Sequence, residues 1–249
     1  MKAFGLQLRL KAFVVHLVGS VLLALVAAAL VYGMWYPAPL DRAVGVSGVF
    51  LLMLGVDVVL GPLLTFAVYQ KGKRSLPFDL AVIVVIQLAA LGYGLHAIAQ
   101  GRPAWLVFNA DRFDVARAND LDTRYAHEAL PPYRQVPWTG PRWVASVNPD
   151  DADKRNQLVL ESASGGADLP ERIDLYRPLE GQGEHLRQRA RPLSELTQFN
   201  TPERVHVMTQ RWPQADAWLP LMSREQPMVV LLDLEQASPV AVVDLSPWP

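Results

Sequence analysis

The chain has 249 residues, of which 51% are hydrophobic, and its formal net charge is -1. This near-neutral balance gives no reason to expect a nucleic-acid partner. The absence of cysteine excludes a disulfide framework, a thiolate nucleophile and a cysteine-ligated metal site.

The charged residues are distributed unevenly along the chain. They are absent from residues 12–40 and 80–101, and Asp57 is the only one in a third apolar stretch between them. Beyond this region both signs of charge are dense and mixed. The sequence therefore predicts a membrane domain over residues 1–101 and a polar domain over residues 102–249.

The first predicted membrane helix covers residues 12–35. Its apolar run is about twice the usual 7–15 residues of a signal-peptide core, which favours an uncleaved anchor. Trp35 and Tyr36 end it as an interfacial aromatic belt would. His16 and Ser20 lie one turn apart on a face of small residues, which we interpret as a surface for helix packing.

The second predicted helix, residues 46–69, carries the most unusual residues of the membrane domain. Asp57 lies near its middle, where a charge costs roughly 2.5 kcal/mol or more and should face protein or trapped water. Gly61 and Pro62 follow one turn later. Because proline has no N–H, the carbonyl of Val58 needs another donor, and a protonated Asp57 is one candidate.

The third predicted helix covers residues 79–100 and contains one uncharged polar residue near its middle, Gln87. Matching depths across the bilayer predicts that Gln87 is the polar partner of Asp57, with Ser20 as a second choice. Thr65 shares a face with Asp57, and both Thr65 and His16 are expected nearer the cytoplasmic side.

The basic residues predict the orientation. Three precede the first helix and three lie between the second and third, whereas the other two flanks have one each. The positive-inside rule then places the N-terminus in the cytoplasm and residues 102–249 outside. In a bacterium with two membranes, this predicts an inner-membrane protein with a periplasmic domain.

The outer domain is predicted to be α+β with antiparallel hairpins. The expected elements are a hairpin (105–108 with 113–117), a short helix (121–130), a Pro-rich loop (131–141), a strand (142–147), helices at 150–162, 183–198 (broken at Pro192) and 201–211, and a second hairpin (228–234 with 240–245).

No motif in the outer domain predicts catalysis, a metal site or a cofactor. Its histidines do not have the spacing of metal ligands, and an intramembrane aspartyl protease would need a second membrane acid besides Asp57. The candidates for partner contacts are Asp111 and Arg112, in a turn expected close to the membrane, and Trp143, because aromatic residues are common at protein interfaces.

Three segments make the chain resemble a known family. GVDVVLGPLLT at 55–65, KGKRSLPFDL at 71–80 and RPAWLVFNADRFDV at 102–115 are similar to the TfpX/TfpZ family of type IV pilin accessory proteins. The resemblance implies an inner-membrane protein that assists assembly of a cognate major pilin, with no reaction or cofactor. The resemblance further implies that the partner pilin inserts an apolar N-terminal helix with a single acidic residue into the same membrane.

The sequence thus favours a non-enzymatic, chaperone-like factor that binds the major type IV pilin. Other inner-membrane pilus assembly proteins and membrane lipid are further candidate partners. The candidate partner-binding residues in the membrane are Asp57, Gly61, Pro62, Thr65 and Gln87. Two alternatives are open: a structural platform subunit of the pilus machine, and a membrane enzyme or transport component acting through Asp57. Asp57 itself could be a proton-linked site, a hydrogen-bonding contact for a partner helix, or a packing group.

Overall fold

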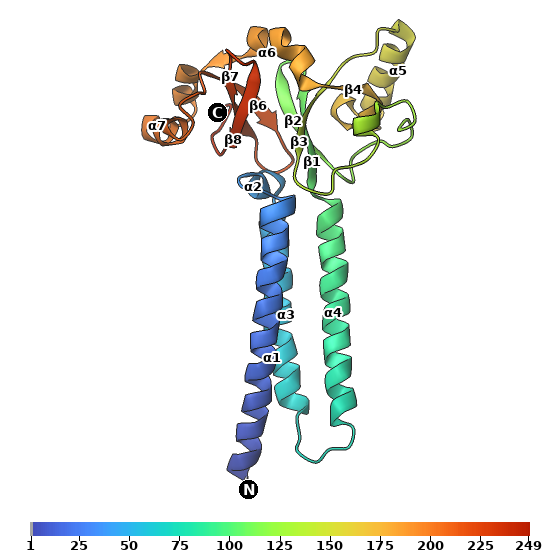
Figure 1. The fold of residues 1–249 in the computed structure, drawn as a ribbon, viewed down its shortest axis with the longest axis vertical. Coiled ribbons are helices and arrows are strands. Elements are labelled where there is room, and N and C mark those ends of the chain that lie inside the picture. Colours follow the sequence, from blue (N-terminus) through green and yellow to red (C-terminus); the bar gives the residue numbers. More distant parts are fainter. Residues whose placement is uncertain (1) are drawn as a thin grey trace. The chain divides into compact units, whose positions relative to one another are not determined.

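Three long apolar helices form the N-terminal part of the chain in the computed structural model, which describes residues 2–249 (Figure 1). They are α1 (Lys2–Leu30), continued by the π-helical turn η1 (Val31–Trp35), α3 (Val46–Val68) and α4 (Leu76–Gln100). Each is long and apolar enough to cross a membrane. The 23 residues of α3 extend over about 35 Å, more than the hydrocarbon thickness of about 30 Å. The prediction of three long apolar helices is confirmed, and α1 begins at Lys2 rather than at residue 12.

The helix α3 packs against both α1 and α4, whereas α1 and α4 have little direct contact with each other (Figure 1). On the α1 side, Phe13 lies edge-on to Phe66, with ring centroids 6.3 Å apart. On the α4 side, Gly94 leaves room for Met53, because a methyl group at Gly94 would overlap the Met53 sulfur. The helix α3 is therefore the centre of the membrane unit.

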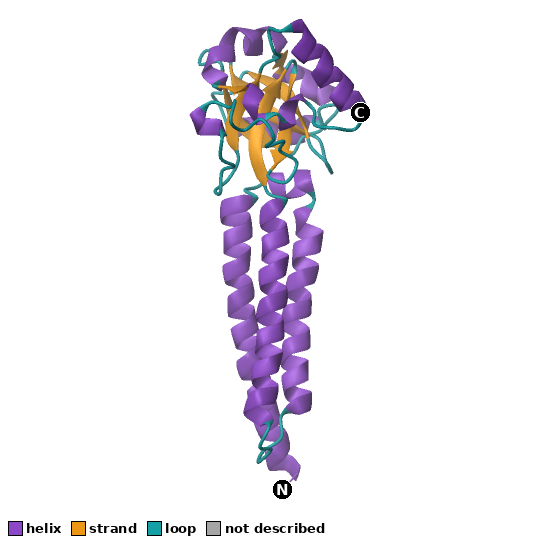
Figure 2. Ribbon diagram, turned by 90° about the vertical axis from the view of Figure 1, so that its right-hand side faces the viewer, coloured by secondary structure: helices purple, strands orange, loops and turns teal. Residues whose placement is uncertain are grey.

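The second unit contains residues 101–249 together with residues 35–45. Its strands, drawn in orange in Figure 2, form one curled sheet. Their order is β4-β3-β1-β2-β6-β7-β8, and β5 pairs with β6. The strands are β1 (Pro103–Asn109), β2 (Arg112–Arg117), β3 (Arg142–Ser146), β4 (Tyr176–Arg177), β5 (Arg191–Pro192), β6 (Ala217–Met222), β7 (Met228–Asp233) and β8 (Ser238–Val243). The helices are α2 (Leu40–Val44), α5 (Ala152–Ala163), α6 (Gly183–Arg189) and α7 (Pro202–Gln210), with shorter 3-10 turns between them.

The predicted α+β class and both predicted hairpins, β1–β2 and β7–β8, are confirmed. The sheet also contains parallel pairs, β1 with β3 and β2 with β6. Side chains of β1 alternate between two cores: Leu106 and Phe108 enter one, and Trp105 and Val107 enter the other. Because successive side chains of a strand point to opposite faces, β1 is buried on both sides, which explains its unbroken apolar run.

Residues 121–130 form turns instead of the predicted helix. Asp122 accounts for the difference, because its carboxylate accepts a hydrogen bond from the backbone N–H of Arg124 at 3.0 Å. Such local side-chain bonds to the backbone compete with helix formation. Asp122 also bridges to Arg172 in a distant segment, which fixes the extended start of this region.

The strand β6 was not predicted, because Pro220 lies within it and proline is normally confined to edge strands. In the structure β6 lies between β2 and β7. On one side it pairs continuously with β7. On the other side β5 pairs at Ala217 and Trp218, and β2 pairs at Leu221 and Met222. Pro220 thus occupies the gap between two partners, where a missing N–H costs little.

The segment between the first two spans is part of the core of the second unit. Leu40 is 3% exposed and Ala43 is fully buried, both in the same core as β1 and β7. The backbone N–H groups of Glu225 and Gln226 donate to the Ala43 carbonyl oxygen at 3.1 and 3.2 Å. The residues that the sequence presents as a short loop are therefore a structural element of the extramembrane unit.

We expect Leu40→Ala to destabilise the second unit by about 2–5 kcal/mol, the usual result of truncating a buried leucine. The control is Leu160→Ala, since Leu160 is 68% exposed on α5. Denaturant unfolding of the purified full-length protein, followed by tryptophan fluorescence, measures both variants. Equal stability of the two variants would contradict the assignment of residues 35–45 to this core.

Candidate functional site

A chain of hydrogen bonds joins the three long helices. His16 on α1 contacts Thr65 on α3, with 2.6 Å between Nδ1 and Oγ1, and contacts Gln87 on α4, with 2.8 Å between Nε2 and Oε1. Gln87 Nε2 also donates to the backbone carbonyl oxygen of Asp57 on α3 at 3.0 Å. Polar groups in apolar surroundings are costly unless they are paired, and here they pair with each other. We call His16, Thr65, Gln87 and Asp57 the polar cluster.

The bonding pattern assigns a direction to each hydrogen bond. The Gln87 side-chain N–H donates to the Asp57 carbonyl oxygen, so the Gln87 side-chain oxygen accepts a hydrogen bond from His16 Nε2. A neutral His16 then carries its proton on Nε2, and its Nδ1 accepts from the Thr65 hydroxyl. The cluster is a continuous donor–acceptor chain from α3 through α1 and α4 back to α3.

Gly61 provides the space that Gln87 occupies. Gly61 and Pro62 are buried on α3, and Thr65 one turn later is only 4% exposed. A methyl group at position 61 would overlap the Gln87 side-chain amide, so only glycine fits here without displacing it. The close approach of α4 to α3 at this point therefore requires a residue without a side chain at position 61.

A cavity of about 410 Å³ lies beside the polar cluster and is lined by all three long helices. Its apolar wall includes Val15 and Leu23 from α1, Leu54 from α3 and Leu88 from α4. Its polar lining consists of His16, Ser20, Asp57, Thr65 and Gln87. We call this feature the membrane groove. It combines a large apolar surface with polar side chains at one place, which suits an apolar ligand that carries a polar group.

The five membrane residues selected from the sequence lie together. Asp57, Thr65 and Gln87 line the membrane groove, and Gly61 and Pro62 are buried next to them on α3. Gln87 does contact Asp57, as the matched depths indicate, and it does so through the Asp57 backbone carbonyl.

The sequence predicts that His16 serves helix packing without naming its partners, and in the structure it bonds both Thr65 and Gln87. One signal was available: His16 and Thr65 were expected at the same depth, nearer the cytoplasmic side. Helix propensity and face periodicity do not show which of two neighbouring helices a side chain will reach, so the contact to Gln87 could not be derived from the sequence.

The three candidates of the outer domain do not form one site. Asp111 is exposed in the β1–β2 turn, and Arg112 pairs with Asp114 at 3.2 Å. Trp143 on β3 packs edge-on against Phe113, with ring centroids 5.2 Å apart. Trp143 is therefore partly a core residue. Asp114, the partner of Arg112, is itself mostly buried, and this burial is the main cause that raises its pKa.

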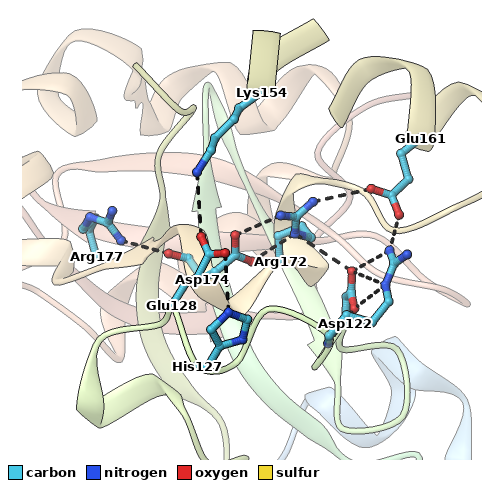
Figure 3. A network of polar contacts seen from close by, with 9 residues as sticks. Asp122, His127, Glu128, Lys154, Glu161, Arg172, Asp174 and Arg177 are labelled. Carbon is cyan, nitrogen blue, oxygen red and sulfur yellow. Dashed lines mark hydrogen bonds and ion pairs between the residues drawn. The ribbon is translucent and has the colours of Figure 1, made fainter. Parts of the chain in front are cut away.

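A network of charged residues lies elsewhere in the second unit (Figure 3). Asp122 bonds Arg124 at 2.7 Å, Asp174 bonds Arg172 at 2.9 Å, and Glu161 pairs with both arginines. The network ties the turn region after β2 to α5 and to the segment before β4. A cavity of about 390 Å³ beside it is lined by both acids and bases, which define no single class of ligand.

Hydrogen bonding to Arg124 is the largest cause that lowers the pKa of Asp122. Among residues 2–249, no group of three or more His, Cys, Asp or Glu side chains is arranged to hold a metal ion.

Three apolar spans and an extramembrane α+β unit define the class of this chain as a multi-pass membrane protein. The family model described as fimbrial assembly protein FimB matches residues 4–45. Two fimbrial assembly proteins of Dichelobacter nodosus, of serogroups E1 and I, are each 32% identical over 228 residues, covering 88% of this chain and 88% of each relative. A third relative from this organism, of serogroups C1 and C2, is 35% identical over 43% of the chain. No solved structure matches the chain. The chain belongs to the fimbrial assembly protein family and takes part in the biogenesis of fimbriae.

Replacing Gly61 by alanine should displace Gln87 and break its bonds to His16 and Asp57. Hydrogen bonds between membrane helices average about 0.6 kcal/mol, so we expect a loss of roughly 1–2 kcal/mol and a lower melting temperature in detergent. The matched control is Gly55→Ala on the same helix, where a methyl group meets no atom within 4 Å. The control should be neutral or slightly stabilised, since alanine favours helix. A Gly61 variant as stable as this control would contradict the described packing.

Replacing Asp122 by asparagine should destabilise the second unit by roughly 1–3 kcal/mol at neutral pH, since the charged hydrogen bonds to Arg124 are lost. Because the folded-state pKa is lowered, this stabilisation is present above the unfolded pKa of about 3.9 and is lost as pH falls through the folded value. The melting temperature of the wild type should therefore approach that of Asp122→Asn below about pH 4. The exposed Asp150→Asn is the control, and a gap between wild type and Asp122→Asn that persists at low pH would refute the assignment.

Proposed function

We propose that this chain is a non-enzymatic assembly factor, similar to the TfpX/TfpZ pilin accessory proteins, that binds the major type IV pilin in the inner membrane before polymerisation. The observation that carries this proposal is the membrane groove. It is lined by three spanning helices, and it presents the polar cluster within an otherwise apolar wall.

A pilin membrane helix has the matching chemistry. It is apolar, and it carries one acid, which is costly in hydrocarbon unless a partner bonds it. Asp57 lines the groove and offers its carboxyl group there, whereas both ring nitrogens of His16 are already bonded within the polar cluster. A neutral Asp57 can donate to a carboxylate, and the helices on both sides provide leucine and valine for the remaining surface.

The orientation that suits this role has the N-terminus in the cytoplasm and the second unit in the periplasm, as the distribution of basic residues predicts. The second unit then lies on the side where the globular part of a pilin resides, and Asp111, Arg112 and Trp143 are its proposed contacts. A platform subunit that binds other pilus assembly proteins is the competing proposal.

Site-specific photo-crosslinking in intact cells separates these proposals. A photo-reactive residue at Leu54 lies in the membrane groove, and one at Leu52 lies on the opposite side of α3, because two residues turn a helix by about 200°. Leu52 is 71% exposed and serves as the matched control.

We expect a crosslink to the major pilin from Leu54 that is several times stronger than from Leu52. Crosslinks from Leu54 only to other assembly proteins would favour the platform subunit. Equal crosslinking at both positions, or none to pilin at Leu54, would overturn the assignment of the groove as the pilin site.

A further inference from the structure

Trp138 is unlike the other tryptophans of the chain. Of the seven, all within the described residues, Trp138 alone is exposed, with an exposed fraction of 60%. It lies in the Pro-rich segment 131–141, for which the sequence predicts a loop. A large aromatic side chain left in water is a candidate for an interaction surface.

Two residues hold Trp138 in place. Its ring lies edge-on to Trp35, with centroids 5.5 Å apart, and the guanidinium of Arg102 lies 5.0 Å from its centroid. Arg102 also donates twice to the carbonyl oxygen of Pro137, at 3.1 Å from Nε and 2.7 Å from Nη2. Arg102 and Trp35 are themselves buried, at 5% and 3% exposed. The exposed Trp138 ring is therefore held in place by its contacts with these two buried residues.

The covalent chain places these two residues at the ends of membrane spans. Trp35 is the last residue of the span Gly5–Trp35, and Arg102 follows the span Leu76–Gln100 by two residues, a reach of about 7 Å. Trp138 contacts both residues. A tryptophan at the end of a span lies in the layer between hydrocarbon and water, where its ring is buried and its N–H stays hydrated.

The charge of the surrounding segment fits the same layer. Residues 131–142 contain Arg134 and Arg142 and no acid, and both arginines are exposed at residue level. Cationic side chains next to an interfacial aromatic ring are attracted to lipid phosphates.

We infer that residues 131–142 form an interfacial anchor, in which Trp138 inserts into the headgroup layer of the bilayer that the long helices cross. The anchor ties a segment of the second unit to lipid at a position far in sequence from any span. This inference rests on the spans and on Trp138, and it is independent of whether the chain binds pilin.

Spin labels on the full-length protein test the inference, because the chain has no cysteine and each introduced cysteine is unique. The label is placed by Thr139→Cys, which leaves Trp138 intact, and the control label by Gln188→Cys on α6; both positions are exposed. The protein is reconstituted into vesicles of phosphatidylethanolamine and phosphatidylglycerol. Collision rates with oxygen and with a water-soluble nickel chelate then report the depth of each label.

We expect the oxygen-to-nickel ratio to be severalfold higher at position 139 than at position 188. Adding Trp138→Ala should lower the ratio at 139 towards that at 188, whereas Trp138→Phe should keep most of it. Equal ratios at the two positions would overturn the inference. A high ratio at 139 that does not change in Trp138→Ala would overturn the role of Trp138.

Discussion

The constraint on which this structure depends is that polar groups within a membrane helix bundle need partners there. In α3 and its neighbours the partners are arranged in series, from Thr65 through His16 and Gln87 to the Asp57 carbonyl. One side chain from α1 and one from α4 both bond to α3. These bonds fix the position of both outer helices along α3, although the two outer helices have little contact with each other. The membrane groove is what this arrangement leaves between them. This groove is where the proposed function places the apolar helix of a partner.

Much of the fold follows from the sequence, because apolar length and charge distribution dictate spans directly. The limits of α3 and α4 agree with their predicted ranges to within a few residues, and the two hairpins follow from pairs of apolar, β-rich runs joined by short turns. The failures have local causes. Asp122 replaces a helix by side-chain bonds to the backbone, and Pro220 conceals a strand because its missing N–H falls between two partners. Leu40 and Ala43 are in a segment too short for any pattern to indicate that it belongs to a core.

The membrane site was accessible from sequence only in part. Depth matching identified Gln87 as the neighbour of Asp57, since both are polar residues near the middle of apolar helices. It could not identify which group of Asp57 is bonded, because the backbone carbonyl becomes available only through the approach that Gly61 permits. Similarly, the contact of His16 with two helices depends on their rotation, and the fixed position of Trp138 depends on Arg102 and Trp35 from distant parts of the chain. Such long-range pairings are set by tertiary packing and leave no periodic signal.

The central claim is that the Asp57 side chain offers a hydrogen bond to a partner helix at the membrane groove. The most direct measurement compares pilus assembly in cells that produce Asp57→Asn or Asp57→Leu, with membrane levels of each variant measured alongside. Asparagine keeps a hydrogen-bonding side chain of the same size without a titratable proton, and leucine removes hydrogen bonding. The account predicts near wild-type pili with asparagine and few or none with leucine at equal protein levels. Normal assembly with leucine would contradict the claim, and loss with asparagine at equal levels would instead assign Asp57 a proton-linked role.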